Sequence, residues 1–374
     1  MTLIKNADIY GPEPLGKKDV LLSFDRIVQI GENLTVNLPG VEIIDASGKK
    51  LVPGFIDLHV HVTGGGGEGG FHTRTPELML RDIICAGVTT LVGVLGTDSY
   101  TRNVESLVAK IKALNNEGIN AYCITNSYQY PPVTLTGSVA NDIIYINEML
   151  GCKVAIADHR GNFPTREELI RLVSEARRAG LISGKPGVLH MHIGADPEGI
   201  KPIMDIVRTT SIPVKHFRPT HMARHLKQAA EFTRMGGYAD FTAKKELAGE
   251  LIGIMDESVV ELMTISSDSN GSMPRWDEKR EKIIGMGVGK MTNLYNVIKE
   301  MITKYNMPVE KALLFITKNP AQAMEFYPRK GVVQAGSDAD IVLLDKELNI
   351  DTVIAKGRIM MRDKDIIVKG TFEE

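Results

Sequence analysis

The chain alternates between two kinds of hydrophobic pattern, and these patterns divide it into an outer part and a middle part. Residues 1–52 and 329–374 carry short runs in which apolar and polar positions alternate, separated by turns rich in Gly, Pro and Asn. Such runs predict β-strands. Because both ends look alike and differ from the middle, we expect them to form one small β-sandwich domain.

The middle part, residues 53–328, alternates between continuous apolar runs and amphipathic runs with helical spacing. The apolar run 89–96 (TTLVGVLG), for example, follows the helix-like run 76–87 (PELMLRDIICAG). This repeated alternation predicts an α/β fold with a parallel sheet, and its length is typical of a (β/α)8 TIM barrel. A doubly wound open sheet is the rival, but no G-x-G-x-x-G motif follows these strands. Between His221 and Asp268, the hydrophobic pattern does not divide clearly into helices and strands.

Composition narrows the classes of partner. The 374 residues are 43% hydrophobic and 24% charged, with a formal net charge of -2, so we expect no nucleic-acid or membrane-surface binding. The N-terminus lacks a signal-peptide pattern, and no apolar run approaches the length of a membrane span. Three scattered cysteines predict no disulfide framework, which favours the cytoplasm.

Polar residues fall at the ends of the predicted barrel strands or inside them. They are His59, His61, Lys153, His190, His192, His221 and Asp268. The carboxyl ends of TIM-barrel strands face the active site, so these side chains are expected to converge at one mouth. Imidazoles and carboxylates are ligands for zinc and related divalent cations. The pattern therefore predicts a metal site, although each histidine alone would more often be an ordinary core or loop residue.

Lys153 lies inside an apolar strand, where a free cation is costly. It could pair with a buried acid, or it could face outward with its amine in solvent. A third interpretation is that its amine carries carbon dioxide as a carbamate, which would turn a buried cation into a carboxylate able to bridge two metals.

Several longer motifs resemble the amidohydrolase superfamily and, within it, the isoaspartyl (β-aspartyl) dipeptidase family. The motif PGFIDLHVH, the barrel lysine and the late SSD are superfamily features. The combination of GGGGE, GTD, DHR, PTHMAR and SSDSNGS is more specific, and the likeness extends over nearly the whole chain. One departure is that the segment between His221 and Asp268 is shorter than this family leads us to expect.

The resemblance implies a site with two zinc ions. His59, His61 and Asp268 would bind the more buried ion, His192 and His221 the second, and a carboxylated Lys153 would bridge both. A hydroxide between the metals would attack the amide, with Asp268 as general base and then acid. Tyr128 would stabilise the oxyanion. His190 would lie one pleat deeper than His192, in the core or behind the ligands.

The implied substrate is a small dipeptide whose aspartate is linked through its side chain. Glu68 suits its ammonium group, and Arg160 and Arg224 suit its carboxylates. The other expected contacts to substrate are Gly66, Thr97, Tyr128 and Ser272. The resemblance also implies a homo-oligomer, with an octamer among the possible forms.

Two alternatives stay open at this point. The chain could be another binuclear amidohydrolase, of the dihydroorotase, hydantoinase or N-acyl amino acid deacylase type. It could also be a scaffold protein that has lost catalysis, although every expected ligand position is filled.

Overall fold

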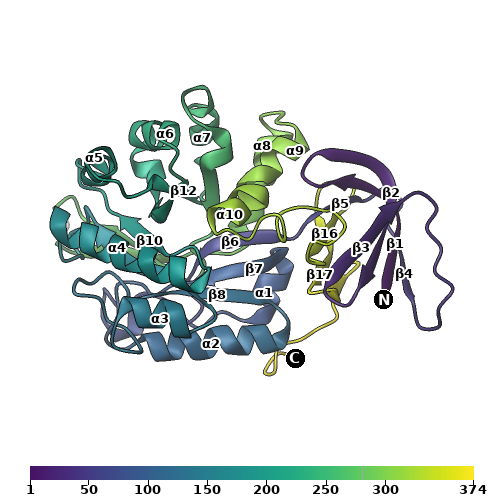
Figure 1. Ribbon diagram of the computed structural model, residues 1–374, viewed down its shortest axis with the longest axis horizontal. Coiled ribbons are helices and arrows are strands. Elements are labelled where there is room, and N and C mark those ends of the chain that lie inside the picture. The colour runs from purple at the N-terminus through teal and green to yellow at the C-terminus, as the bar shows by residue number, and fades with distance from the viewer. Residues whose placement is uncertain (280) are drawn as a thin grey trace.

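The computed structural model describes residues 1–279 and 281–374, and eight parallel strands form its centre (Figure 1). Six of them pair in the order β11-β10-β9-β8-β7-β6, and β12 pairs with β13. The eight strands are β6 (Phe55–Val60), β7 (Val88–Gly93), β8 (Asn120–Thr125), β9 (Met149–Ile156), β10 (Val188–Ile193), β11 (Phe217–Thr220), β12 (Ala239–Thr242) and β13 (Met263–Ser266).

These strands follow one another as the strands of a TIM barrel do. β12 packs beside β11, and the end of β13 returns to β6, where Val60 and Ser269 form a parallel bridge. Among the described residues, the ladder of paired strands is interrupted between β11 and β12. The eight strands are therefore arranged in barrel order, as predicted, but not joined by one continuous ladder.

Burial on both sides explains why these strands read as continuous apolar runs. Every residue of β6, β7, β9, β10, β11 and β13 is buried, because one face points inward and the other packs against helices. The few polar side chains on the inner face are therefore exceptions that need partners.

Ten α-helices are described. They are α1 (Leu80–Cys85), α2 (Val104–Glu117), α3 (Val139–Tyr145), α4 (Arg166–Ser183), α5 (Lys201–Thr209), α6 (Leu226–Arg234), α7 (Leu247–Ile252), α8 (Asn293–Thr303), α9 (Val309–Leu313) and α10 (Lys318–Ala323). Local signals set the ends of the longest one: a capping box between Thr165 and Glu168 starts α4, and left-handed Gly184 ends it.

The two chain ends form a nine-stranded mixed sheet, which lies to one side of the parallel strands (Figure 1). Its strands are β1 (Thr2–Tyr10), β2 (Pro14–Ser23), β3 (Arg26–Gly31), β4 (Glu42–Asp45), β5 (Lys50–Pro53), β16 (Ile341–Leu344), β17 (Ile350–Ala355), β18 (Arg358–Arg362) and β19 (Asp365–Ile366). The expected sandwich had two sheets, whereas here one ladder links all nine strands because β5 pairs with both β1 and β16. The domain limits at residues 52 and 329 stay predictions.

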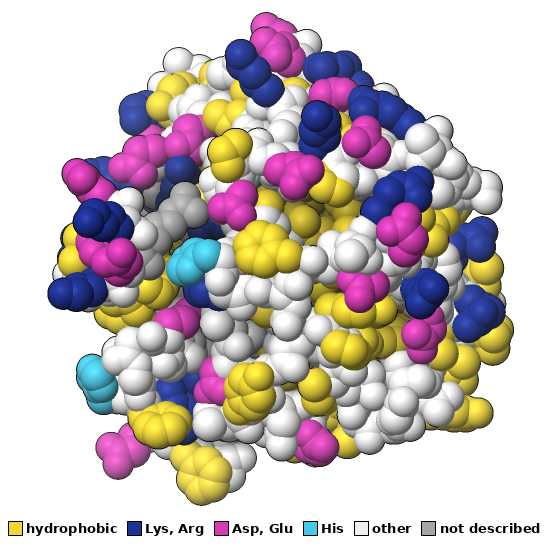
Figure 2. Space-filling view, turned by 90° about the vertical axis from the view of Figure 1, so that its left-hand side faces the viewer, with side chains coloured by type: hydrophobic (Ala, Val, Ile, Leu, Met, Phe, Trp, Pro, Cys, Tyr) yellow, Lys and Arg dark blue, Asp and Glu magenta, His cyan; other side chains and the backbone are white. Residues whose placement is uncertain are grey.

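A hairpin of β14 (Ser272–Trp276) and β15 (Ile283–Val288) leaves the parallel strands just after β13. At the end of the molecule away from the nine-stranded sheet, basic and acidic side chains are interspersed with small apolar areas (Figure 2). Among the described helices, none has both the length and the apolar character needed to span a bilayer.

Candidate active site

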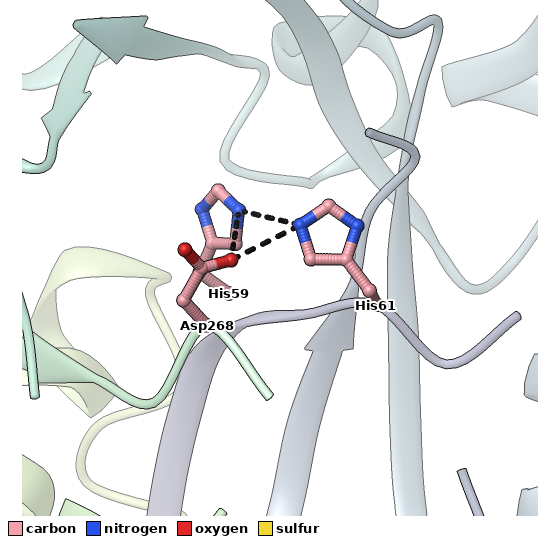
Figure 3. A group of neighbouring side chains, drawn as sticks. All are labelled: His59, His61 and Asp268. Carbon is pink, nitrogen blue, oxygen red and sulfur yellow. Dashed lines mark hydrogen bonds and ion pairs between the residues drawn. The ribbon is translucent and has the colours of Figure 1, made fainter. Parts of the chain in front are cut away.

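Three predicted ligands meet where β6 and β13 end. His61 Nε2 lies 3.3 Å from His59 Nε2 and 3.1 Å from Asp268 Oδ1, and His59 Nε2 lies 3.5 Å from the same oxygen (Figure 3). Backbone hydrogen bonds join the two strand ends: Asp268 N–H donates to the His59 carbonyl, and His61 N–H to that of Ser269. Asp268 also adopts a left-handed backbone, φ 52°, which is uncommon outside glycine and often marks functional sites.

The donor chemistry of this group fits a divalent cation. One ligand atom from each of His59, His61 and Asp268 lies within 4.8 Å of the others, and both histidines are buried. Burial, reinforced by the nearby Lys153 amine, lowers the pKa of both imidazoles below the usual value. Neutral imidazoles keep a lone pair for a metal, so these three residues, which we call the donor group, could hold zinc or a similar ion.

Gly271 packs directly against the donor group. A Cβ atom there would come within 2.5 Å of Asp268 Oδ1 and 2.8 Å of His61 Cδ2, so both donors would have to move. We therefore expect Gly271→Ala to weaken zinc binding by about 10-fold or more, measured by chelator competition. Gly253→Ala is the control, because its Cβ would make only ordinary contacts. Equal zinc affinity in the two variants would contradict this role.

Lys153 is wholly buried beside the donor group. Its Nζ lies 3.5 Å from His59 Nε2 and donates a 2.6 Å hydrogen bond to the Leu95 carbonyl. No carboxylate of the described residues forms an ion pair with it, so it neither faces solvent nor pairs with an acid. Burial lowers its pKa to about 7. By contrast, the buried Lys330 contacts Asp338 and Asp340 at 2.8 and 2.6 Å.

His192 and His221 lie beside the donor group, but they do not complete a second cluster in this structure. Both ring nitrogens of His192 are engaged, Nδ1 by the Tyr128 hydroxyl at 2.7 Å and Nε2 by Asp158 Oδ2 at 2.8 Å. His221 Nδ1 lies 2.5 Å from Thr242 Oγ1 and 4.0 Å from Asp268 Oδ2. Their rings are 4.5 Å apart, so the second ligand pair is close but stays a prediction.

The donor group opens into a cavity of about 500 Å³. Predicted site residues that line it are His61, Gly66, Thr97, Tyr128, Arg160, His192, His221, Arg224, Asp268 and Ser272. His59 and Lys153 lie behind these, deeper between the strands. The structure thus brings the predicted metal ligands and substrate contacts to one place, at the carboxyl ends of the strands.

Glu68 is held at this cavity by three predicted site residues. Its Oε1 accepts hydrogen bonds from Ser272 at 2.7 Å, Thr97 at 3.1 Å and Arg160 at 3.1 Å. Its side chain is only 5% exposed. The preceding glycines make this possible, because Gly66 has φ +83° and lies where a Cβ would meet the Thr73 carbonyl at 2.4 Å. A fixed, buried carboxylate therefore lies directly behind three residues that line the cavity of the donor group.

Arg160 links Glu68 to Asp158, a residue for which the motifs predict no role. Two guanidinium nitrogens contact the Asp158 carboxylate at 3.0 and 2.8 Å. Burial alone would raise the pKa of the Asp158 carboxyl. The hydrogen bonds from His192 and Arg160 outweigh burial and hold this pKa well below the usual range. Arg224, also cavity-lining, donates to the Ile193 carbonyl at 2.7 Å. The site thus contains two guanidinium groups at fixed positions.

Other contributors were not predicted. Asp57 Oδ1 accepts hydrogen bonds from the backbone N–H of His59 and Ser267, and burial raises its pKa to about 7. Trp276, from β14, lines the cavity and meets the His159 ring edge-on at 5.0 Å. Alternate positions facing inward along 55–60 could have indicated Asp57, whereas nothing in the sequence places Trp276.

Comparisons with known proteins agree with this arrangement. A sequence model of the amidohydrolase family matches residues 246–360. Two solved structures of β-aspartyl dipeptidase from Fervidobacterium islandicum AW-1 are 42% and 40% identical, with TM-scores of 0.94 and 0.90. The first covers 98% of this chain and 97% of that chain, the second 98% of each. A dihydroorotase from Listeria monocytogenes is 25% identical, over 96% of this chain and 93% of the relative.

The fold and site define a hydrolase of the amidohydrolase superfamily, with a TIM-barrel catalytic domain and a typically metal-dependent chemistry. Within that superfamily, the chain belongs to the β-aspartyl dipeptidase family. The resemblance drawn from the sequence motifs is therefore confirmed.

Proposed function

We propose that this protein hydrolyses dipeptides in which aspartate is linked to the next residue through its side-chain carboxyl. The relative that is 42% identical was solved in complex with β-Asp-Leu. The observation in this chain that carries the proposal is the carboxylate of Glu68, which Ser272, Thr97 and Arg160 hold beside the donor group. A β-aspartyl dipeptide has a free α-ammonium, which needs an acid of this kind.

The carboxylates of the substrate would be bound by guanidinium groups. Arg160 and Arg224 both line the cavity; the Arg160 side chain is largely buried, whereas Arg224 is exposed to solvent. Guanidinium groups pair with carboxylates in bidentate geometry, and burial strengthens such pairs. Glu68, Arg160 and Arg224 thus offer one carboxylate and two guanidinium groups for the one ammonium and the two carboxylates of the substrate.

We propose that His59, His61, Asp268, His192 and His221 hold two zinc ions, bridged by a carboxylated Lys153. Burial lowers the pKa of Lys153 to about 7, so near neutral pH a large share of the amine is uncharged and its lone pair can attack carbon dioxide. A bond forms between Nζ and the carbon, one carbon–oxygen double bond becomes a single bond, and one proton passes from the nitrogen to water, which gives a carbamate anion. His192 would turn from Asp158 to take part. When bound, the ions would supply a water acidic enough to ionise near neutral pH and a Lewis acid for the amide carbonyl.

The proton transfers fall to Asp268, whose carboxylate lies at the cavity wall. It would accept the proton of the attacking water and deliver a proton to the leaving amine. Tyr128 lines the cavity, and its hydroxyl would turn from His192 Nδ1, now at 2.7 Å, to donate a hydrogen bond to the oxyanion that develops at the carbonyl. Burial raises the pKa of Tyr128, so its hydroxyl keeps its proton for this bond.

A paired assay tests the proposal. Zinc-loaded protein would be offered β-aspartyl-leucine and α-aspartyl-leucine at equal concentration, and release of leucine would be measured. We expect hydrolysis of the β-linked peptide alone. Protein that binds zinc but cuts neither peptide would overturn the substrate assignment, and cyclic amides would then be assayed, given the similarity to a dihydroorotase.

Replacing Glu68 tests how the ammonium is recognised. We expect Glu68→Gln to lower kcat/KM for β-aspartyl-leucine by about 100-fold, because a buried charge pair with substrate is lost. Succinyl-leucine is the same molecule without the amine, so its slower hydrolysis should change little. Glu278→Gln, at the rim of the same cavity, serves as control. An equal loss for both substrates would mean that Glu68 only supports the local structure.

We also propose that the protein assembles as a homo-oligomer, as the resemblance implies. Light scattering coupled to size-exclusion chromatography of the full chain measures the mass directly.

A further inference from the structure

His190 lies directly behind the donor group and was given no role in the proposed function. It is on β10, 5% exposed, and its Nε2 is 2.8 Å from His59 Nδ1. The two rings are 4.9 Å apart and tilted by 50°. This is a hydrogen bond between two buried imidazoles, on the side of His59 that faces away from the other donors.

The two nitrogens of His59 thus have different surroundings. Nε2 faces His61 Nε2 at 3.3 Å, with Asp268 Oδ1 and Lys153 Nζ both at 3.5 Å, whereas Nδ1 faces His190. A neutral imidazole has one N–H and one lone pair. If Nε2 is to bind a cation, the ring proton must be on Nδ1, and that proton then needs an acceptor. His190 Nε2 is the atom in position to accept it.

We propose that His190 is a positioning residue, which accepts the Nδ1–H bond of His59 and so fixes the tautomer and ring orientation that direct Nε2 toward the inner metal. The inference deepens the proposed function, because it concerns the same metal site. Hydrogen bonds from a ligating histidine to a fixed acceptor commonly set metal affinity in this way. His190 is itself no ligand of the donor group, because the His59 ring stands between them.

The residues around His190 offer no other side chain that could readily accept the hydrogen bond from His59 Nδ1–H. The register partners of His190 on the neighbouring strands are Lys153 and Arg218. The Arg218 guanidinium only donates hydrogen bonds, and the Lys153 amine is directed to the Leu95 carbonyl and to the Nε2 side of His59. Beyond His190 is a small cavity of about 10 Å³, bordered also by Arg218, Tyr238 and Asp240, whose carboxylate already accepts three hydrogen bonds. A space of this size admits about one water molecule. Without His190, the Nδ1–H of His59 would therefore be buried with no built acceptor, or the proton would move to Nε2 and block the metal.

Two substitutions of similar polarity separate positioning from packing. In His190→Gln, the side-chain oxygen can occupy the place of Nε2 and accept the bond. In His190→Asn, the shorter amide reaches only the place of Nδ1. His190→Phe keeps a ring but offers no acceptor. His216→Gln is the matched control, since His216 is equally buried but its Nδ1 faces the carbonyls of Pro186 and Gly187 instead of a donor-group residue.

Zinc affinity would be measured on the full chain by competition with a chromophoric chelator, for the tighter and the weaker ion separately. We expect the Asn and Phe variants to lose about 10- to 100-fold in affinity for the tighter ion, and the Gln variant to stay within about 3-fold of wild type. The control should match wild type. Thermal unfolding of the zinc-free proteins checks that the variants are folded. If the Phe variant does not fold, the comparison of the Gln and Asn variants tests the inference on its own.

Equal zinc affinity in the Asn and Gln variants, or wild-type affinity in the Phe variant, would overturn the inference. Wild-type protein that takes up no zinc would overturn it too. Because the readout is zinc binding, a failure of the substrate assignment is recognised separately: the affinities would follow the expected order while β-aspartyl-leucine stays uncut.

Discussion

Lys153→Ala protein should hydrolyse β-aspartyl-leucine at least about 1000-fold more slowly than the wild type, because the two proposed zinc ions would lose their shared ligand. The structure makes the position unusual in a specific way. Lys153 is wholly buried and unpaired with any acid of the described residues, and its Nζ lies 3.5 Å from a nitrogen of the donor group. A permanent cation there would repel metal, whereas a carbamate would bind it. Initial rates and zinc content, measured on the same samples, test the expectation.

A small carboxylate should partly restore this variant. The substitution leaves a space next to the donor group that acetate or propionate could fill, with its two oxygens in place of the carbamate oxygens. The same acid added to wild-type protein controls for inhibition and ionic strength. Exchange with ¹³C-bicarbonate, followed by ¹³C NMR, would detect the carbamate in the wild type and its loss in the variant. A variant that keeps its rate to within about 10-fold would show that Lys153 is no metal bridge.

The alternation of apolar and amphipathic runs was enough to predict the order of most parallel strands. β12 (Ala239–Thr242) escaped prediction because it has only four residues, and Asp240 and Thr242 interrupt its apolar character. Those two are polar for local reasons: Asp240 accepts hydrogen bonds from Thr220, Thr264 and Ser266, and Thr242 contacts His221. The pairing of both chain ends in one sheet was also beyond sequence reasoning, since it depends on β5 having partners on both edges.

The candidate site was predictable where a residue type and a strand end coincide. His59, His61 and Asp268 follow this rule, and they form the donor group. The roles of Asp158, His190 and Trp276 could not be predicted from the sequence. Each depends on a contact with a residue distant in the chain or on another element: Asp158 with His192, His190 with His59, and Trp276 with His159. His190 is the clearest case. Its sequence context predicted that it lies one pleat below His192, but only the 2.8 Å contact to His59 Nδ1 shows what it could do there.

Asp268→Asn should lower kcat for β-aspartyl-leucine by about 100- to 10,000-fold, with little change in KM, because an amide cannot take a proton from the attacking water. The substitution keeps the shape of the side chain and an oxygen beside His61. The nearest buried carboxylates are already engaged, Glu68 by Ser272, Thr97 and Arg160, and Asp158 by Arg160 and His192.

Zinc content separates the two roles of Asp268. If the variant still binds two ions per chain when zinc is in excess and remains slow, the loss belongs to proton transfer rather than to metal binding. Asp277→Asn is the matched control, because Asp277 lies at the wall of the same cavity. Activity of the zinc-loaded Asp268→Asn protein within about 10-fold of wild type would exclude Asp268 as the proton acceptor and direct the search for the base to other residues of the cavity.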